Sequence, residues 1–174
     1  MENIKIWRYS IPPIKGQGWG IFLLDSTGMF AAVTDYGNYA FKWTYHGCKD
    51  FREFFSDIRE GSVNEYYLKK LYQGRKMEFD GKGTMQLIKE HILQNRRDRS
   101  YTKEFAREEW DRIKDFEGEF DSDVQFSRWY DETEIEDAHE FYCSDYPADL
   151  KAFGKEILPR LAAVLREELK KEAV

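Results

Sequence analysis

The hydrophobic period of this chain changes once, after His46-Gly47, and that change constrains the fold more than any other feature. Up to residue 46, apolar residues alternate with polar ones or form short runs between turns rich in Gly, Asp and Asn, which indicates β-strands. From Asp50 onward they recur every three or four residues, which indicates amphipathic helices. A run of strands followed by a run of helices predicts an α+β fold.

Residues 1–46 are predicted to form a three- to four-stranded antiparallel meander, with turns at 25–28 and 35–38. Its last strand carries four alternating aromatic residues, Tyr39, Phe41, Trp43 and Tyr45. Such a strand can serve as a base-stacking platform, but platforms of that kind sit among basic residues and this strand holds only Lys42. We therefore expect these aromatic rings to pack against the helices.

Residues 47–174 are predicted to form five to seven helices, in a single domain spanning 1–174. Gly61 and Gly74 are expected to end the first two helices, with a brief extended piece at Met77 and Phe79. Asp80 or Thr84 should cap the third helix and Thr102 the fourth. Capping-box patterns predict two short helices over 123–131 and 134–143. The last helix should start near Pro147 and kink or restart at Pro159.

Composition narrows the class of protein. Aromatic residues reach 17% of 174, which is far from a disordered composition. The longest apolar run, residues 20–24, is much shorter than the roughly 20 residues of a membrane span, and the N-terminus has no secretory pattern. Cys48 and Cys143 are too few for a disulfide scaffold. We expect a cytoplasmic protein.

Negative charge is concentrated in one segment. The chain carries a net charge of −6, yet residues 115–149 hold thirteen Asp or Glu and one Arg, so the rest of the chain carries +6. Residues four apart on a helix share a face, which would place Glu136 beside both Glu132 and Glu140. Such a face could dock a protein, hold a divalent cation together with His139, or keep the protein soluble. The candidate partner-binding residues are Asp131, Glu132, Glu134, Glu136, Asp137 and Glu140.

A basic cluster precedes this segment. Arg96, Arg97 and Arg99, followed by Tyr101, could contact phosphate and stack a base. They also suit the C-terminal end of a helix, where positive charge complements the helix dipole. The mixed charges that follow favour this second interpretation.

The remaining motifs favour structural roles. The glycines of 16–20 open a strand, whereas a dinucleotide loop opens a helix. The Asp80–Thr84 segment lacks the phosphate-loop spacing and is interpreted as a helix cap. His46 and Cys48 supply two of the four ligands that structural zinc needs. We assign no catalytic residue, metal or cofactor.

Several stretches, in consistent order over about two-thirds of the chain, resemble a group of uncharacterised proteins encoded by tailed phages and prophages. They are Trp19-Gly20 with its apolar strand and the segments 34–40, 50–54, 67–71, 88–92 and 105–110. The resemblance implies a phage accessory gene. Small phage proteins of this kind often bind a host or phage macromolecule, including components of bacterial defence systems.

The leading hypothesis is therefore a non-enzymatic phage accessory protein that binds a host or phage protein through its acidic residues. The alternatives are a nucleic-acid-associated protein using the arginine cluster and a metal-dependent enzyme using the carboxylates of 131–140. The sequence does not define the oligomeric state.

Overall fold

A computed structural model describes residues 3–60, 64–73, 77–118 and 120–173. The chain divides into two compact units. Unit 1 comprises Met1–Lys76 and Pro147–Val174, and unit 2 comprises Met77–Tyr146. The single-domain prediction stays a prediction.

Unit 1 contains the predicted meander. Four strands pair antiparallel in the order β1 (Ile6–Ile11), β2 (Gly20–Asp25), β3 (Met29–Thr34) and β4 (Gly37–Lys42). Gly28 has φ +89° in the turn between β2 and β3, where a Cβ would collide with the carbonyl oxygen of Trp43. The α+β prediction and the four-stranded meander are confirmed.

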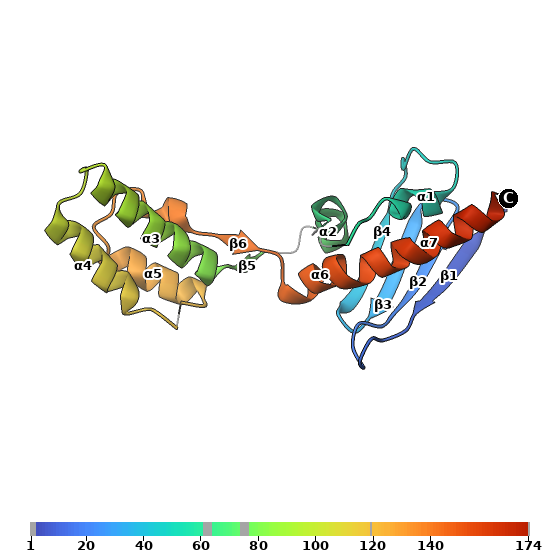
Figure 1. Cartoon of the computed structure of the whole chain (residues 1–174), viewed down its shortest axis with the longest axis horizontal. Coiled ribbons are helices and arrows are strands. Elements are labelled where there is room, and N and C mark those ends of the chain that lie inside the picture. Colours follow the sequence, from blue (N-terminus) through green and yellow to red (C-terminus); the bar gives the residue numbers. More distant parts are fainter. Residues whose placement is uncertain (1–2, 61–63, 74–76, 119, 174) are drawn as a thin grey trace. The chain divides into compact units, whose positions relative to one another are not determined.

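Helices cover one face of this sheet (Figure 1). They are α1 (Phe51–Ser56), α2 (Glu65–Tyr72), α6 (Ala148–Ala152) and α7 (Leu158–Glu172). A π-helical turn, η2 (Phe153–Ile157), joins α6 to α7, and Pro159 lies in the first turn of α7. There the missing amide hydrogen of proline costs least, so the helix restarts as predicted. Gly61 and Gly74, the expected helix ends, lie outside the described residues.

The aromatic residues of the fourth strand pack as expected, with one exception. The Trp43 ring is buried, and its centroid lies 5.4 Å from the centroids of both Phe54 and Phe55. The Tyr39 ring lies 4.3 Å from Phe153. Tyr45 is 98% exposed, because β4 ends at Lys42 and the alternation of the strand stops there.

Arg52 joins α1, α7 and the sheet. Its side chain is 1% exposed and pairs with Asp50 at 2.7 Å, Glu172 at 2.5 Å and Glu168 at 3.2 Å. The guanidinium carbon lies 4.8 Å from the centroid of the Trp7 ring. Three carboxylates and an aromatic face thus compensate one buried cation.

Unit 2 is built on helices. Two short strands, β5 (Glu78–Phe79) and β6 (Ser144–Asp145), pair antiparallel. Between them in the chain lie α3 (Gly81–Arg97), α4 (Lys103–Lys114), α5 (Asp123–Glu132) and the 3₁₀ turn η1 (Ala138–Phe141). Asp80 caps α3 by accepting from the Gly83 amide at 3.0 Å, and Thr102 caps α4 by accepting from the Phe105 amide at 3.1 Å. Both predicted caps are confirmed.

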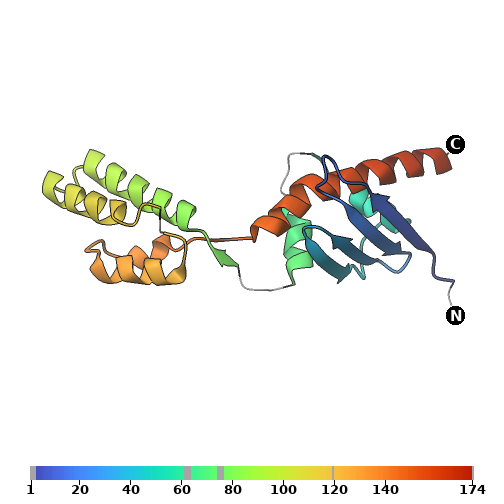
Figure 2. The same cartoon turned by 90° about the horizontal axis from the view of Figure 1, so that it is seen from below.

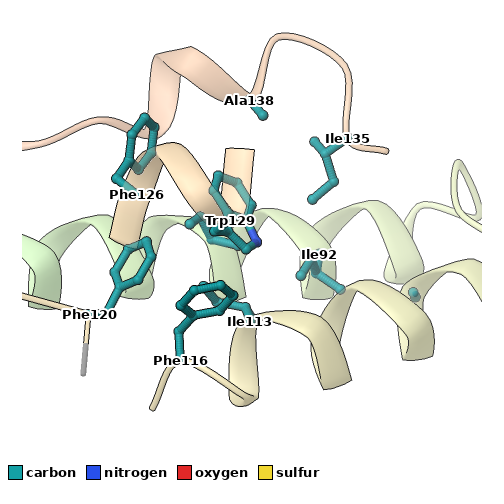
Figure 3. Packing of buried hydrophobic residues seen from close by; sticks show 10 residues of the cluster. Ile92, Ile113, Phe116, Phe120, Phe126, Trp129, Ile135 and Ala138 are labelled. Atoms are coloured by element: carbon teal, nitrogen blue, oxygen red, sulfur yellow. The ribbon is translucent and has the colours of Figure 1, made fainter. Parts of the chain in front are cut away.

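The core of unit 2 surrounds Trp129, which is fully buried (Figure 3). Side chains from α3, α4, α5 and η1 pack around the indole, including Ile92, Ile113, Phe126 and Ala138. This packing orients α5 and the loop that follows it.

One predicted helix is wrong in its extent. The segment 134–143 was expected to be helical, but residues 133–137 form a loop and only Ala138–Phe141 forms a 3₁₀ turn. The Thr133 hydroxyl donates to the Glu109 carboxylate at 2.6 Å and accepts from the Ile135 amide at 3.2 Å. It therefore does not bond to the amide three residues ahead, as a capping box requires. Within the described residues, no helix is long and apolar enough to cross a membrane.

Candidate protein-binding surface

A buried carboxylate builds the loop that carries the acidic residues. Glu109 lies on the inward side of α4 and is 1% exposed. Besides the Thr133 hydroxyl, it accepts a hydrogen bond from the Glu134 amide at 3.1 Å and pairs with Arg112. A buried, paired and hydrogen-bonded carboxylate fixes the geometry of the groups around it. The loop 133–137 is thus anchored to α4.

The structure places the six candidate carboxylates on three consecutive pieces of chain. Asp131 and Glu132 end α5, three lie in the loop, and one lies in η1. The predicted helix faces pairing Glu136 with Glu132 and Glu140 are not formed, because the loop interrupts the helix. The loop carries Glu134, Glu136 and Asp137, and η1 carries Glu140. All six side chains are exposed.

Arginines of unit 2 approach two of these carboxylates. Arg128 lies 3.6 Å from Glu132, and Arg112 lies 3.9 Å from Glu134. Both are long contacts at exposed carboxylates, which stabilise little. Within the part of the chain that the structure describes, no Lys, Arg or His pairs with Asp131, Glu136, Asp137 or Glu140.

Two of the loop carboxylates border a hollow with aromatic residues, which we call the acidic hollow. Tyr101 and Phe105 line it together with Glu134 and Glu136. The two rings meet edge to face, with centroids 4.7 Å apart. Burial raises the pKa of the Tyr101 hydroxyl, as do the negative charges of Glu109 and Glu136, so the phenol stays neutral. The hollow thus combines a ring surface with negative charge at its rim.

The predicted nucleic-acid residues lie at the end of α3. Arg96 and Arg97 occupy its last turn, where they complement the helix dipole, and Arg99 follows with φ +63°. All three are exposed, but Tyr101 is half-buried rather than exposed. Its hydroxyl lies 2.8 Å from Nε2 of His91, and its ring packs on Phe105. Tyr101 is therefore not the fully exposed ring that base stacking needs, although part of it still lines the acidic hollow.

The acidic and basic candidates meet at one groove. Arg97 from α3 and Glu140 from η1 line it together with His91 and Phe141. Burial lowers the pKa of the His91 imidazole, and the His91 and Phe141 rings lie 4.9 Å apart. Charges of both signs at this groove oppose the approach of a polyanion.

The other motifs that the sequence singled out lie in turns, at a strand start and at a helix cap. In the ranges that the structure describes, no three His, Cys, Asp or Glu side chains are placed to hold a metal ion. Cys48 forms local hydrogen bonds with His46, and burial with nearby carboxylates raises the pKa of its thiol, which keeps it protonated. Gly20 opens strand β2, and the Asp80 carboxylate occupies the start of α3.

Sequence reasoning missed the two residues that organise the charges, Arg52 and Glu109. Glu109 had a signal, since it lies three or four residues from Phe105, Ala106 and Ile113 on the apolar side of a predicted helix. A carboxylate at such a position is buried only when it is paired. Arg52 lies two residues after Asp50, and the sequence does not indicate that the two distant carboxylates of Glu168 and Glu172 also surround it.

A family model described as a phage family matches residues 1–167. No curated protein and no solved structure matches the chain. The match spans nearly the whole sequence and agrees with the resemblance carried by its short segments. The chain belongs to this family of phage proteins.

Proposed function

We propose that this phage protein is an accessory factor that acts in the host cytoplasm by binding a host or phage protein with a basic surface. The observation that carries the proposal is the acidic hollow. Tyr101 and Phe105 offer ring surface, and Glu134 and Glu136 supply negative charge beside it. Aromatic rings and carboxylates together recognise a Lys or Arg side chain, because both attract a cation.

The neighbouring carboxylates extend this recognition beyond one side chain. Asp131, Asp137 and Glu140 are exposed and hold no cation of the described residues. Their combined field would steer a basic partner toward the hollow and speed its association. Anchoring by Glu109 keeps the loop ordered before binding, which lowers the entropy lost on association.

A phage protein with this surface is suited to block a host protein that acts on nucleic acid, because its carboxylates can occupy the basic site meant for phosphate. Inhibition of a bacterial defence system is the biological role we propose on this basis. The non-enzymatic mode follows from the same argument, since the acidic hollow is a means of recognition and the proposal requires no bond to be made or broken.

The experiment compares the parent chain with a variant in which four carboxylates become amides, Asp131→Asn, Glu134→Gln, Glu136→Gln and Asp137→Asn. Both proteins are used as bait in lysates of infected and uninfected cells, and proteins retained only by the parent are identified by mass spectrometry. The purified partner should then bind the variant at least about tenfold more weakly at low salt.

A matched control removes the same amount of charge elsewhere in unit 2. The four control positions are Glu78, Glu104, Glu108 and Asp111, all exposed. This variant should bind like the parent. Equal binding by the 131–137 variant and the parent would show that the acidic hollow is not the binding site.

A further inference from the structure

The sheet of unit 1 has a second face that no helix of the unit's described residues covers (Figure 2). An antiparallel sheet with one solvated face normally alternates apolar and polar residues, whereas strands covered on both faces are apolar throughout. Strands β2 and β3 follow the second pattern, with sequences GIFLLD and MFAAVT. On the outer side Leu23 is 44% exposed, Met29 46% and Val33 50%.

These residues form one continuous patch, which we call the open sheet face. The strand register places Leu23 opposite Ala31, Ile21 opposite Val33, and Ala31 opposite Ala40. Ala31 lies between Met29 and Val33 on β3, on the outer side of the sheet. Apolar side chains gathered on an uncovered sheet face, rather than scattered singly, indicate a binding surface.

The cations of the open sheet face lie on its two outer strands, and one of them, Lys42, lies near enough to Asp25 to help lower the pKa of that carboxyl. Arg8 is on β1 and Lys42 on β4, both exposed. The carboxylate of Asp25, on the same face, accepts hydrogen bonds from the Thr27 amide at 2.8 Å and the Met29 amide at 3.0 Å. The hydrogen bonds of its own turn thus occupy much of the Asp25 carboxylate, and Arg8 and Lys42 are the exposed cations that the outer strands present to a partner.

A second copy of the chain does not suit this face. Two such sheets stacked face to face about a two-fold axis would place either β1 over β4 or β1 over β1, so their cationic edges would meet. The face is also small, about 20 Å long and about 14 Å between the outer strands. That area is well below the roughly 800 Å² that each partner of a standard interface buries.

We propose that the open sheet face binds one amphipathic helix of a partner protein, with an apolar stripe flanked on both sides by carboxylates. A helix with its side chains is about 10–12 Å wide, which fits between outer strands about 14 Å apart. A strand length of about 20 Å matches about thirteen helical residues. Arg8 and Lys42 then pair with the two acidic flanks while the apolar stripe covers Leu23 and Val33.

The test uses two synthetic sixteen-residue helical peptides that share a leucine stripe, one flanked by Glu and the other by Gln. Binding to the full chain is measured by fluorescence anisotropy at low and high salt. The Glu peptide should bind at least about tenfold more tightly at low salt, and added salt should reduce the difference. Equal affinity of the two peptides would overturn the proposal.

Three variants locate the site. Leu23→Glu should weaken Glu-peptide binding at least about tenfold. The conservative double variant Arg8→Gln with Lys42→Gln should abolish the preference for the Glu peptide without burying any new charge. Val124→Glu, at a residue of unit 2 that is 74% exposed, is the matched control and should bind like the parent.

Three further results would contradict the proposal: unchanged binding by the Leu23 variant, a preference retained without the two cations, or a parent dimer that Leu23→Glu dissociates in analytical ultracentrifugation. The variant with amides at Asp131, Glu134, Glu136 and Asp137 should bind the peptide normally. The peptide result is therefore independent of the function proposed for unit 2.

Discussion

The two units bury ionised groups of opposite sign, and each unit has a net charge of the same sign as the group it buries. Unit 1 buries Arg52 and carries 17 basic against 13 acidic residues, a net charge of +4. Unit 2 buries Glu109 and carries 10 basic against 20 acidic residues, a net charge of −10. Each buried charge engages nearby counterions. Arg52 pairs with three carboxylates, and Glu109 pairs with Arg112, an arginine that also lies near the acidic loop.

This comparison teaches that the buried group decides which charges remain available outside. In unit 1 the side chains of Asp50, Glu168 and Glu172 face a guanidinium. In unit 2 Arg112 pairs closely with the buried Glu109 and lies farther from Glu134. The side chains of Glu134 and Glu136 therefore face solvent. The acidic surface is therefore a consequence of how α4 is packed as well as of composition.

The largest effect is expected for Arg52→Met. Removing the buried cation leaves Asp50, Glu168 and Glu172 close together without compensation, which should lower the free energy of unfolding by about 3 kcal/mol. Urea denaturation of the full chain, followed by hydrogen exchange of the amides of unit 1, measures this. The control is Lys170→Met, which removes an exposed cation 3.3 Å from Glu167 and should change stability by less than about 0.5 kcal/mol. Equal effects at the two positions would remove the role given to Arg52.

Glu109→Ala should have the next largest effect, about 2 kcal/mol, because the Thr133 hydroxyl and the Glu134 amide lose a buried acceptor. Glu109→Gln should cost less, since its amide oxygen can still accept. Hydrogen exchange of the Glu134 amide measures the local consequence and should accelerate most in the alanine variant. Unchanged exchange would mean that the loop does not depend on Glu109.

Acidification should affect the two units in different pH ranges. Burial lowers the pKa of His91 below its ordinary 6.5, so the neutral imidazole stabilises unit 2 above pH 6.5 and that stability is lost as the pH falls further. Hydrogen bonds from Arg52 hold the pKa of Asp50 below 3.8 and that of Glu172 below 4.5, although burial opposes the shift at both. Their contribution to unit 1 is lost only as the pH falls below about those values.

Hydrogen exchange measured separately for the amides of each unit, from pH 7 to pH 3, shows whether unit 2 loses stability at a higher pH than unit 1. His91→Gln should remove the first phase in unit 2 and leave the later phase in unit 1. A first phase that persists in this variant would assign it to another group.

The smallest effect on stability is expected for the variant with amides at Asp131, Glu134, Glu136 and Asp137. These side chains are exposed and at most loosely paired, so the free energy of unfolding should change by less than about 0.5 kcal/mol. Thermal unfolding measures it. A large loss would mean that these carboxylates hold the fold, and binding results with this variant could then no longer be interpreted.

Local patterns predicted much of the fold. The meander of residues 1–46 was predictable because period-two alternation and turn residues are signals between neighbours in the sequence. The caps at Asp80 and Thr102 were predictable for the same reason. The helix expected at 134–143 was wrong because a contact 24 residues distant, from Thr133 to Glu109, replaces its cap. No local pattern reports such a partner.

The sequence predicted which residues belong to the candidate site but not how they are arranged in space. The sequence identifies six carboxylates but cannot place Glu134 and Glu136 beside the rings of Tyr101 and Phe105, because that hollow depends on how α4 packs against the loop. The open sheet face was hidden in the same way. Apolar runs in β2 and β3 indicate two covered faces, but only the position of the helices shows which face lacks a cover.

The most direct test of the central claim is the salt dependence of binding between the identified partner and two proteins, the parent chain and the variant with amides at the four positions in 131–137. If the acidic hollow and its neighbouring carboxylates bind a basic surface, parent affinity should fall steeply with salt, while the variant binds weakly with a much flatter dependence. Equal affinities with equal salt dependence would contradict the account.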